Sequence, residues 1–300
     1  MAKRREREGF GSLLISIFMS LLLLSFVIAI FLYKTDVALL NPKGFIAQEQ
    51  RSLLLNAVGI MLIVAVPTLF LLYFFAWKYR ETNDSANRHS THSKHKSRRN
   101  AILRWFIPAF TVFILALSMV PATYELDPHK PITSTNKPMT IQVVALRWKW
   151  LFIYPEQNIA TVNFVQIPID TPVRFELSAD NISMSSFWIP HLGGQLYAMT
   201  GHVNKLNLIA DTPGDYPGLS AEINGEGFAD MKFTARASSQ KDFDFWVRQV
   251  KGSPQNLDIL TYESLLTPTE RNPVALYASS EVDLYDDIAI KYSASHNHTE

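Results

Sequence analysis

Apolar residues concentrate in three long stretches of the N-terminal part of the chain. Phe10 to Tyr33, Leu53 to Trp77 and Ile102 to Ala122 are each almost free of charged side chains. At roughly 1.5 Å per helical residue, each stretch is long enough to cross a hydrocarbon core of about 30 Å. Large soluble proteins also bury apolar helices, but no comparable stretch follows residue 122. The pattern therefore predicts a membrane protein whose helices precede a water-soluble domain.

The first stretch has two interpretations. A basic start, an apolar run and a polar segment are also the layout of a cleaved secretory signal. The run from Phe10 to Tyr33 is longer than a usual signal core, and no cleavage motif of small residues follows it. We favour a retained helix; the two interpretations together give two or three transmembrane helices.

The distribution of Lys and Arg predicts the orientation of these helices. Residues 78–100 carry many basic side chains against only Glu81 and Asp84, and the first seven residues are also basic. Short basic loops stay on the cytoplasmic side of a membrane. Trp77 and Trp105 fall at the same interface, where amphipathic rings settle. We therefore expect the N-terminus and the 78–100 loop inside, and everything after residue 122 outside.

Short β-type segments recur in the outer part of the chain. Proline and glycine separate them, as in the stretch from Pro190 to Gly194, and this spacing predicts an antiparallel sandwich or barrel. Asn207 alternates with apolar neighbours, as in a half-buried strand. The predicted strands are Thr140–Trp148, continued by Leu151–Tyr154, then Ala160–Ile167, Val173–Ser178, Phe187–Ile189, Val203–Ala210 and Met231–Arg236.

A helical pattern replaces the strands near residue 239. Ser239 and Asp242 have the spacing of a capping box, and Gly252 is a plausible helix end, which predicts a helix over Gln240–Lys251. Two further short helices are predicted around Leu257–Leu266 and Glu281–Tyr292. We divide the chain into an N-terminal apolar span (1–37), a transmembrane hairpin (38–122) with its basic loop at 78–100, an outer domain (123–237) and a helical tail (238–300).

Composition adds one decisive fact, the absence of cysteine. The sequence therefore offers no disulfide, no thiolate metal ligand and no cysteine nucleophile.

Two segments resemble subunit II of the haem–copper oxidases. Residues 147–155 (RWKWLFIYP) are similar to that family's aromatic segment, and residues 185–190 (SSFWIP), running on through Leu192 and Gly193, are similar to its "HSFW-P-LG" strand and loop. Order, spacing and topology agree over nearly all of residues 38–250. The resemblance implies a membrane-anchored all-β protein: two or three transmembrane helices, a cupredoxin-like antiparallel β-sandwich and a helical C-terminal tail.

Copper-bearing members of that family hold a dinuclear copper site with two Cys, two His, one Met and one main-chain carbonyl as ligands. Soft thiolates, imidazole and thioether suit copper. In this sequence the corresponding positions are Ser185, Ser220, Glu222, Asn224, Phe228 and Met231. Only the carbonyl position and the methionine remain, so the resemblance implies a vestigial site that binds no copper. We expect no catalytic, cofactor-binding or metal-binding residue in this chain.

The missing ligands resemble the quinol-oxidising branch of the family, typified by the cytochrome bo-type ubiquinol oxidases. Residues 38–44 and 148–163 are similar to that branch in particular. The resemblance implies a respiratory complex that oxidises ubiquinol, reduces oxygen at a haem–copper centre in subunit I and pumps protons. The expected partners are subunit I, the other subunits, the lipid membrane and quinol through the complex, with no nucleic acid. The expected location is the bacterial inner membrane, multi-pass, with the large C-terminal domain in the periplasm.

Two alternatives stay open at this point. One is a cytochrome c oxidase subunit II, against which the missing ligands argue. The other is a free-standing, membrane-anchored periplasmic binding module, for which an exposed Met or His cluster would be expected. Trp148 and Trp150 could belong to an electron path, but packing is the favoured role without copper beneath them.

Overall fold

The computed structural model describes residues 19–20, 23–27, 30, 37–78, 97–182 and 184–296. It contains two compact units, residues 1–41 and 42–300. Of the predicted first span only residues 19–20, 23–27 and 30 are described, all helical, and its retention stays a prediction; most of the basic 78–100 loop lies outside the described residues.

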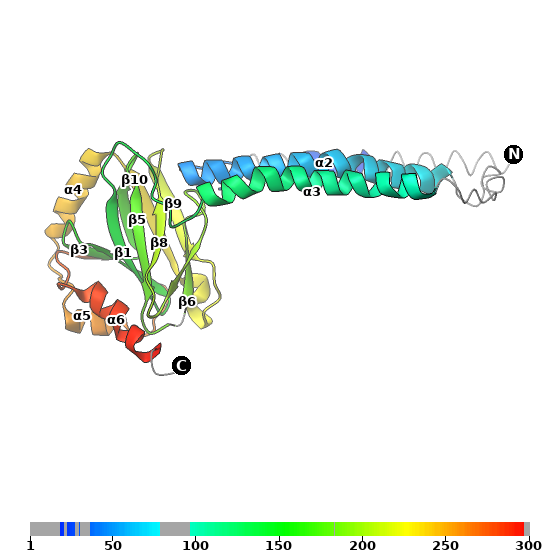
Figure 1. Ribbon diagram of the computed structural model, residues 1–300. Coiled ribbons are helices and arrows are strands. Elements are labelled where there is room, and N and C mark those ends of the chain that lie inside the picture. The colour runs from blue at the N-terminus through cyan, green and yellow to red at the C-terminus, as the bar shows by residue number, and fades with distance from the viewer. Residues whose placement is uncertain are drawn as a thin grey trace. The chain divides into compact units, whose positions relative to one another are not determined.

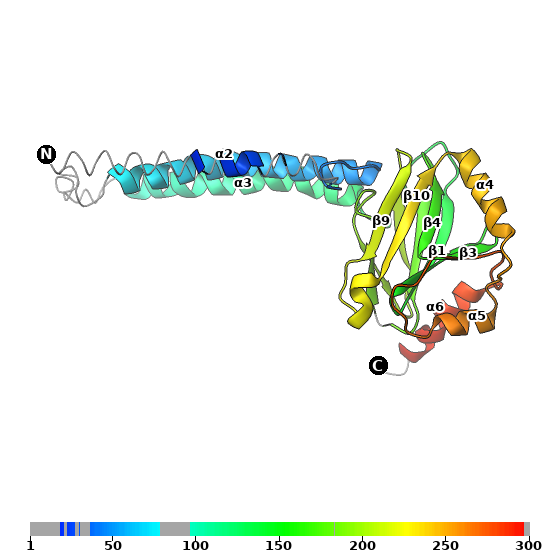
Figure 2. The same cartoon turned by 180° about the vertical axis from the view of Figure 1, so that it is seen from behind.

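Two long apolar helices open the second unit. Helix α2 spans Phe45–Lys78 and helix α3 spans Ser97–Glu125, and both are long and apolar enough to cross a membrane. They lie side by side (Figures 1 and 2). Helix α2 begins before the predicted Leu53 and has 34 residues. Its length of about 51 Å exceeds a hydrocarbon core of about 30 Å, so its polar first turns lie beyond the apolar run.

The part of the chain after α3 forms two sheets packed face to face (Figure 1). The six-stranded sheet has the order β11–β3–β2–β1–β5–β8, and the five-stranded sheet has the order β4–β10–β9–β6–β7. Most pairs are antiparallel, but β1 pairs with β5, and β4 with β10, in parallel. The strand bounds are β1 Met139–Leu146, β2 Lys149–Tyr154, β3 Ile159–Val162, β4 Phe164–Pro168, β5 Val173–Ala179, β6 Met184–Trp188, β7 Leu196–Met199, β8 Asn204–Leu208, β9 Gly214–Ser220, β10 Lys232–Ser238 and β11 Ala275–Tyr277.

Two predicted strands are each divided by a residue with positive φ. The run Thr140–Trp148 does not continue into Leu151–Tyr154, because Trp148 (φ 62°) turns the chain back into an antiparallel hairpin. The run Ala160–Ile167 is divided at Asn163 (φ 56°), which sends β3 and β4 into different sheets. The side-chain oxygen of Asn163 accepts a hydrogen bond from the Trp150 amide at 2.9 Å, which stabilises this corner.

Side chains fill both faces of the six-stranded sheet. Ile141 and Val143 of β1 point into the core between the sheets, whereas Val144 and Leu146 contact the C-terminal tail on the other face. Double burial explains why β1 and β2 have nearly continuous apolar sequences rather than alternating ones. Asn207, which alternates with apolar neighbours as in a half-buried strand, is itself only 7% exposed, and its side-chain amide donates to the carbonyl of Pro128.

Three helices lie in the C-terminal region (Figure 2). Helix α4 covers Gln240–Lys251, the predicted range, with Ser239 accepting from the amide of Asp242 at its N-cap. Helix α5 spans Ile259–Leu265 and α6 spans Leu284–His296. The tail is attached to the sandwich by polar contacts as well. Buried Lys149 donates to the carbonyls of Leu265 and Thr267 and to the Thr269 hydroxyl at 2.6–3.0 Å.

Candidate functional site

Four of the six copper-ligand positions meet in one buried cluster. Ser185 lies on β6, Ser220 ends β9, and Met231 directly precedes β10. The Ser220 amide donates to the Met231 carbonyl, and β6 pairs with β9, so the topology alone brings these elements together. All three side chains are at most 2% exposed. Asn224 reaches them from the connecting loop.

A neutral hydrogen-bond network joins the side chains of Ser185, Asn224 and Met231. The amide nitrogen of Asn224 lies 2.8 Å from the Ser185 hydroxyl and 3.2 Å from the Met231 sulfur. The Ser220 hydroxyl donates to the Glu222 carbonyl at 3.1 Å. Phe228 lies half-buried in the short 3₁₀ helix η2 (Glu226–Asp230), and its ring adds no polar atom to the network.

This donor set does not fit a dinuclear copper centre. Copper of that kind needs bridging thiolates and imidazoles, and these positions offer hydroxyls, an amide and one thioether. The thioether sulfur already faces the Asn224 amide, and the Glu222 carbonyl already accepts from Ser220. Among the described residues, no group of three or more His, Cys, Asp or Glu is arranged to hold a metal ion.

The loop that follows Ser220 is packed against an indole. A Cβ at Gly227 would lie 2.4 Å from Cδ2 of Trp148, so only glycine allows this approach. Trp150 is fully buried, with its ring 5.2 Å from that of Phe187 and 5.9 Å from that of Phe233. Both tryptophans therefore contribute to packing at this end of the sandwich.

The glycines at 193 and 194 serve a contact with helix α2. The amide of Lys43 donates to the His191 carbonyl at 2.8 Å, and that of Ala47 to the Leu192 carbonyl at 3.2 Å. A Cβ at Gly193 would lie 2.7 Å from Cδ2 of Leu208 and 3.2 Å from the Ile46 side chain, and a Cβ at Gly194 would lie 3.0 Å from Nε2 of Gln50. His191 lies in the predicted turn segment from Pro190 to Gly194, where a surface position is expected, but it is 5% exposed and stacks on Tyr216. The segment that resembles the family's strand and loop thus holds the start of helix α2 in this structure.

A second buried polar cluster connects the sandwich to the tail. Asp180 is fully buried and accepts hydrogen bonds from the hydroxyls of Tyr262 and Tyr292, each at 2.6 Å, and from Nζ of Lys291 at 3.0 Å. Burial by itself raises the pKa of Asp180, but these donors outweigh it, so that its pKa lies below the usual carboxyl value. Sequence reasoning missed this cluster because its members are far apart in the chain.

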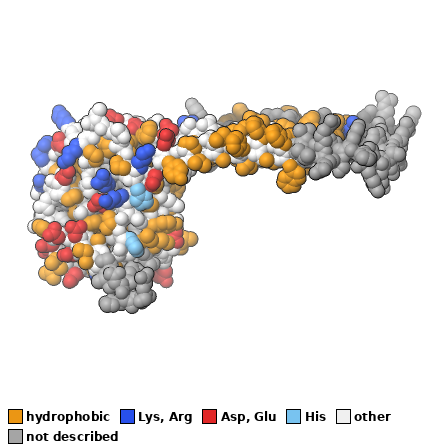
Figure 3. Space-filling view, in the orientation of Figure 1, with side chains coloured by type: hydrophobic (Ala, Val, Ile, Leu, Met, Phe, Trp, Pro, Cys, Tyr) orange, Lys and Arg blue, Asp and Glu red, His pale blue; other side chains and the backbone are white. Residues whose placement is uncertain are grey.

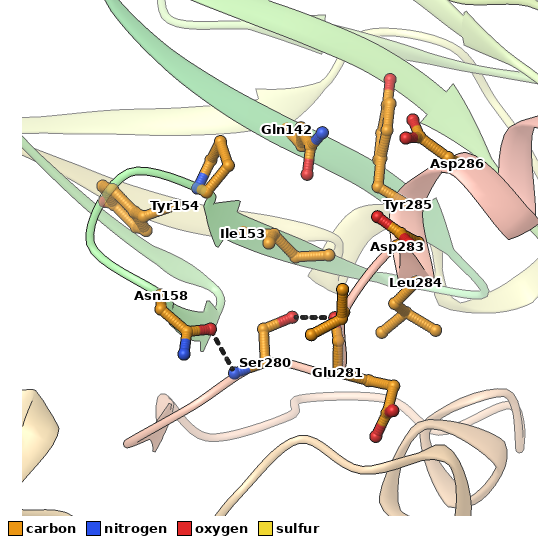
Figure 4. A pocket seen from close by; sticks show the side chains of 12 residues that line it. Gln142, Ile153, Tyr154, Asn158, Ser280, Glu281, Asp283, Leu284, Tyr285 and Asp286 are labelled. Carbon is orange, nitrogen blue, oxygen red and sulfur yellow. Dashed lines mark hydrogen bonds between the residues drawn. The ribbon is translucent and has the colours of Figure 1, made fainter.

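A cavity of about 370 Å³ lies between β2 and the segment that leads into α6. Figure 4 shows Glu281 pointing away from Asp283 and Asp286, so these carboxylates do not converge on a common point. The Asn158 side chain accepts from the Ser280 amide at 3.4 Å and holds the tail segment in place. This arrangement is a packing contact of the tail.

Comparison with known proteins agrees with this geometry. The family model of the cytochrome c oxidase subunit II periplasmic domain matches residues 156–238, and the COX Aromatic Rich Motif matches residues 251–296. Cytochrome bo(3) ubiquinol oxidase subunit 2 of Pseudomonas putida is 45% identical over 97% of this chain and 88% of its own length. The protein of the same name from Pseudomonas aeruginosa is 42% identical over 92% of this chain and 82% of its own length. Ubiquinol oxidase subunit 2 of Acetobacter aceti is 41% identical over 88% of this chain and 86% of its own length.

Solved structures are more distant. The periplasmic domain of cytochrome oxidase subunit II from Bradyrhizobium japonicum is 20% identical, with a TM-score of 0.38, and the match covers 41% of this chain and 98% of that one. The similarity to the bacterial relatives extends over most of both chains. This chain therefore belongs to the ubiquinol oxidase subunit 2 family, the subunit II of haem–copper oxidases.

Proposed function

We propose that this chain is the copper-less subunit II of a proton-pumping ubiquinol oxidase, with a structural role beside the catalytic subunit I. Electron transfer from quinol to oxygen takes place at haem and copper in subunit I, and the six vestigial positions bind no metal. The observation that carries the proposal is the neutral network of Ser185, Asn224 and Met231 at the ligand positions. A subunit that relays electrons from a soluble cytochrome needs a metal at this place. A subunit of an oxidase that takes electrons from a membrane-dissolved quinol needs no such relay.

The spanning helices support the role as a partner of subunit I. Helices α2 and α3 leave large apolar side chains exposed along their length, and Figure 3 shows them as a nearly continuous hydrophobic surface. Lipid covers part of such a surface, and helix packing in a membrane covers the rest. We place the 78–100 loop in the cytoplasm and the residues after 122 in the periplasm of a bacterial inner membrane. The domain division 1–37, 38–122, 123–237 and 238–300 follows this topology.

Affinity purification of the tagged chain in a mild detergent tests the proposal. We expect a haem-containing partner, oxygen consumption with ubiquinol, and no visible or resonance signal of a dinuclear copper centre. Oxidation of cytochrome c in place of ubiquinol would support the cytochrome c oxidase alternative. A well-folded chain that accumulates without any haem partner would support a free-standing binding module.

Restoring the ligands tests the vestigial site itself. The substitutions Ser185→His, Ser220→Cys, Asn224→Cys and Phe228→His supply two imidazoles and two thiolates beside Met231 and the Glu222 carbonyl. We expect the fourfold variant of the complex to bind two additional coppers and to show intense thiolate-to-copper absorption. The wild-type complex should show neither. A correctly folded fourfold variant without this absorption would contradict the assignment of the six positions.

A further inference from the structure

A cavity of about 730 Å³ lies at the outer ends of the two spanning helices. The first turns of α2, the end of α3 and residues 126–127 and 130–134 line it, together with Ile209 and Asp211 of the sandwich. Polar and apolar side chains share its wall, with Phe45 and Leu53 among the apolar ones. The cavity is therefore amphipathic.

The charges of this cavity are mostly negative. Glu49, Glu125, Asp127 and Asp211 face one cation, Lys130. Asp127 is paired with His129, and Asp211 accepts a hydrogen bond from the Gln48 amide at 3.0 Å. Within the described part of the chain, Glu49, Glu125 and Lys130 form no ion pair. Two carboxylates and one ammonium are thus available to a ligand that carries both signs of charge.

A second, mainly apolar cavity of about 510 Å³ continues from the first. The two share Leu53, Ala122, Leu126 and Asp127, and the second adds Met119 and Tyr124 of α3. Met119 and Ala122 belong to the apolar run that spans the membrane. A polar chamber that continues into an apolar groove along a spanning helix can hold an amphiphile, with its polar head in the chamber and its apolar chain in the groove.

The depth of the polar chamber matches the headgroup layer of a bilayer. Glu49 precedes the apolar run of α2 by one helical turn, and Glu125 follows that of α3 by nearly one turn. One turn advances about 5.4 Å. The polar layer on each side of a hydrocarbon core is about 5 to 7 Å thick. Both carboxylates therefore lie where lipid headgroups lie, which rests on the membrane placement in the proposed function.

We propose that this cavity binds a phospholipid with a primary ammonium in its headgroup, of the phosphatidylethanolamine type. Glu49 and Glu125 accept hydrogen bonds from the ammonium, Lys130 contacts the phosphate, and the groove at Met119 and Tyr124 holds an acyl chain. A quaternary ammonium has no N–H group and therefore cannot donate a hydrogen bond to these carboxylates. A lipid with a glycerol headgroup has no positive charge and a net negative charge, which the mostly negative chamber repels.

Native mass spectrometry of the purified complex tests this assignment. The delipidated assembly is titrated with phosphatidylethanolamine, phosphatidylcholine or phosphatidylglycerol of identical acyl chains. We expect the wild type to hold one phosphatidylethanolamine more tightly than either other lipid. The double variant Glu49→Gln and Glu125→Gln should lose about tenfold in affinity for it and lose the preference, because two charge-assisted hydrogen bonds are weakened.

Two further variants sharpen the result. Ala122→Trp fills the region that both cavities share and should abolish the site while leaving the carboxylates in place. Glu263→Gln removes an exposed carboxylate on α5 and should leave lipid binding unchanged. Equal phosphatidylethanolamine binding by wild type and the double variant would overturn the inference, as would a wild type without headgroup preference.

The haem spectrum and ubiquinol oxidation of the same preparations separate this inference from the proposed function. An active complex without the lipid preference contradicts the lipid site alone. A chain that purifies without haem contradicts the proposed function, and the same titration of that chain still decides whether its cavity binds the lipid.

Discussion

Replacement of Asp180 by asparagine should release the C-terminal tail from the sandwich. Asp180 lies at the end of β5 and is bound by Tyr262 of α5 and by Lys291 and Tyr292 of α6. Its side chain is fully buried, so an asparagine there removes the charge that these three donors share and directs an amide N–H toward some of them. The tail keeps its apolar contacts and loses its ionic attachment.

The magnitude follows from the burial of the partners. Breaking a fully buried ion pair costs about 3 to 5 kcal/mol. The side chain of Lys291 is 49% exposed and stays partly solvated in the variant, so we expect the lower end, about 3 kcal/mol. An opening free energy lowered by about 3 kcal/mol corresponds to a roughly 150-fold larger open population.

Hydrogen–deuterium exchange in the intact complex measures this opening. Amides of α5 and α6 should exchange about 150-fold faster in Asp180→Asn, while those of β1 and β5 keep their protection. Glu263→Gln, which changes an exposed carboxylate next to Tyr262, is the matched control and should leave exchange unchanged. Unaltered tail protection in Asp180→Asn at neutral pH would refute the role of this carboxylate.

The same residue predicts a pH dependence. Because the folded state lowers the pKa of Asp180, the unfolded or open state binds the proton more readily. The stabilisation is therefore complete above the unfolded carboxyl pKa of about 3.9 and is lost as the pH falls through the lower folded value. Tail exchange of the wild type should accelerate below about pH 4, and Asp180→Asn should lack this step.

Two further substitutions test the packing of the molecule. Gly44→Ala places a Cβ 2.3 Å from the Ile209 carbonyl oxygen and should destabilise the start of α2 by about 2 to 3 kcal/mol, seen as a lower Tm of the complex. Gly59→Ala, where a Cβ meets nothing within 4 Å, is the control and should be neutral or slightly stabilising; equal effects of both would contradict the close approach. Lys149→Met leaves three acceptors without their donor and should lower stability by about 3 kcal/mol in denaturant unfolding, whereas exposed Lys251→Met should change little. An unchanged unfolding midpoint in Lys149→Met would show that the tail does not depend on this ammonium.

Local signals explain which elements the sequence predicts well. Helix α4 has its predicted bounds because Ser239, Asp242 and Gly252 specify its ends within one short segment. The spanning helices are predicted equally well, because an apolar run of membrane length seldom occurs outside a transmembrane helix. Strand β9 (Gly214–Ser220) is not among the strands predicted from the sequence, because Pro217 and Gly218 interrupt a strand pattern. Its pairing with β10 places Gly218 against the Phe233 ring, where a Cβ would lie 2.1 Å from Cζ, and this is a tertiary requirement.

The resemblance indicates which segments of the chain form the candidate site, but it does not indicate the contacts within it. The resemblance placed Ser185, Ser220 and Met231 at one centre, and the structure brings them together. The role of Asn224 as the donor that joins Ser185 and Met231 depends on contacts across 39 and 7 residues of sequence. No periodicity or composition rule reports such a contact. The burial of His191 was missed for the same reason, since β9 supplies the Tyr216 ring on which it stacks.

The neutral network also makes single substitutions toward copper ligands costly in stability. The Asn224 amide nitrogen contacts both Ser185 and Met231, although the Oδ1 atom of Asn224 has no hydrogen-bond partner among the described residues, so a substitution of Asn224 removes both contacts. Asn224→Cys alone takes the amide from the Ser185 hydroxyl and the Met231 sulfur, and a buried polar group without a partner costs about 1 to 3 kcal/mol. A stepwise introduction of the copper ligands into this chain would therefore pass through less stable variants before a bound metal could compensate. The hydrogen bonds at these positions thereby oppose the stepwise gain of a metal site.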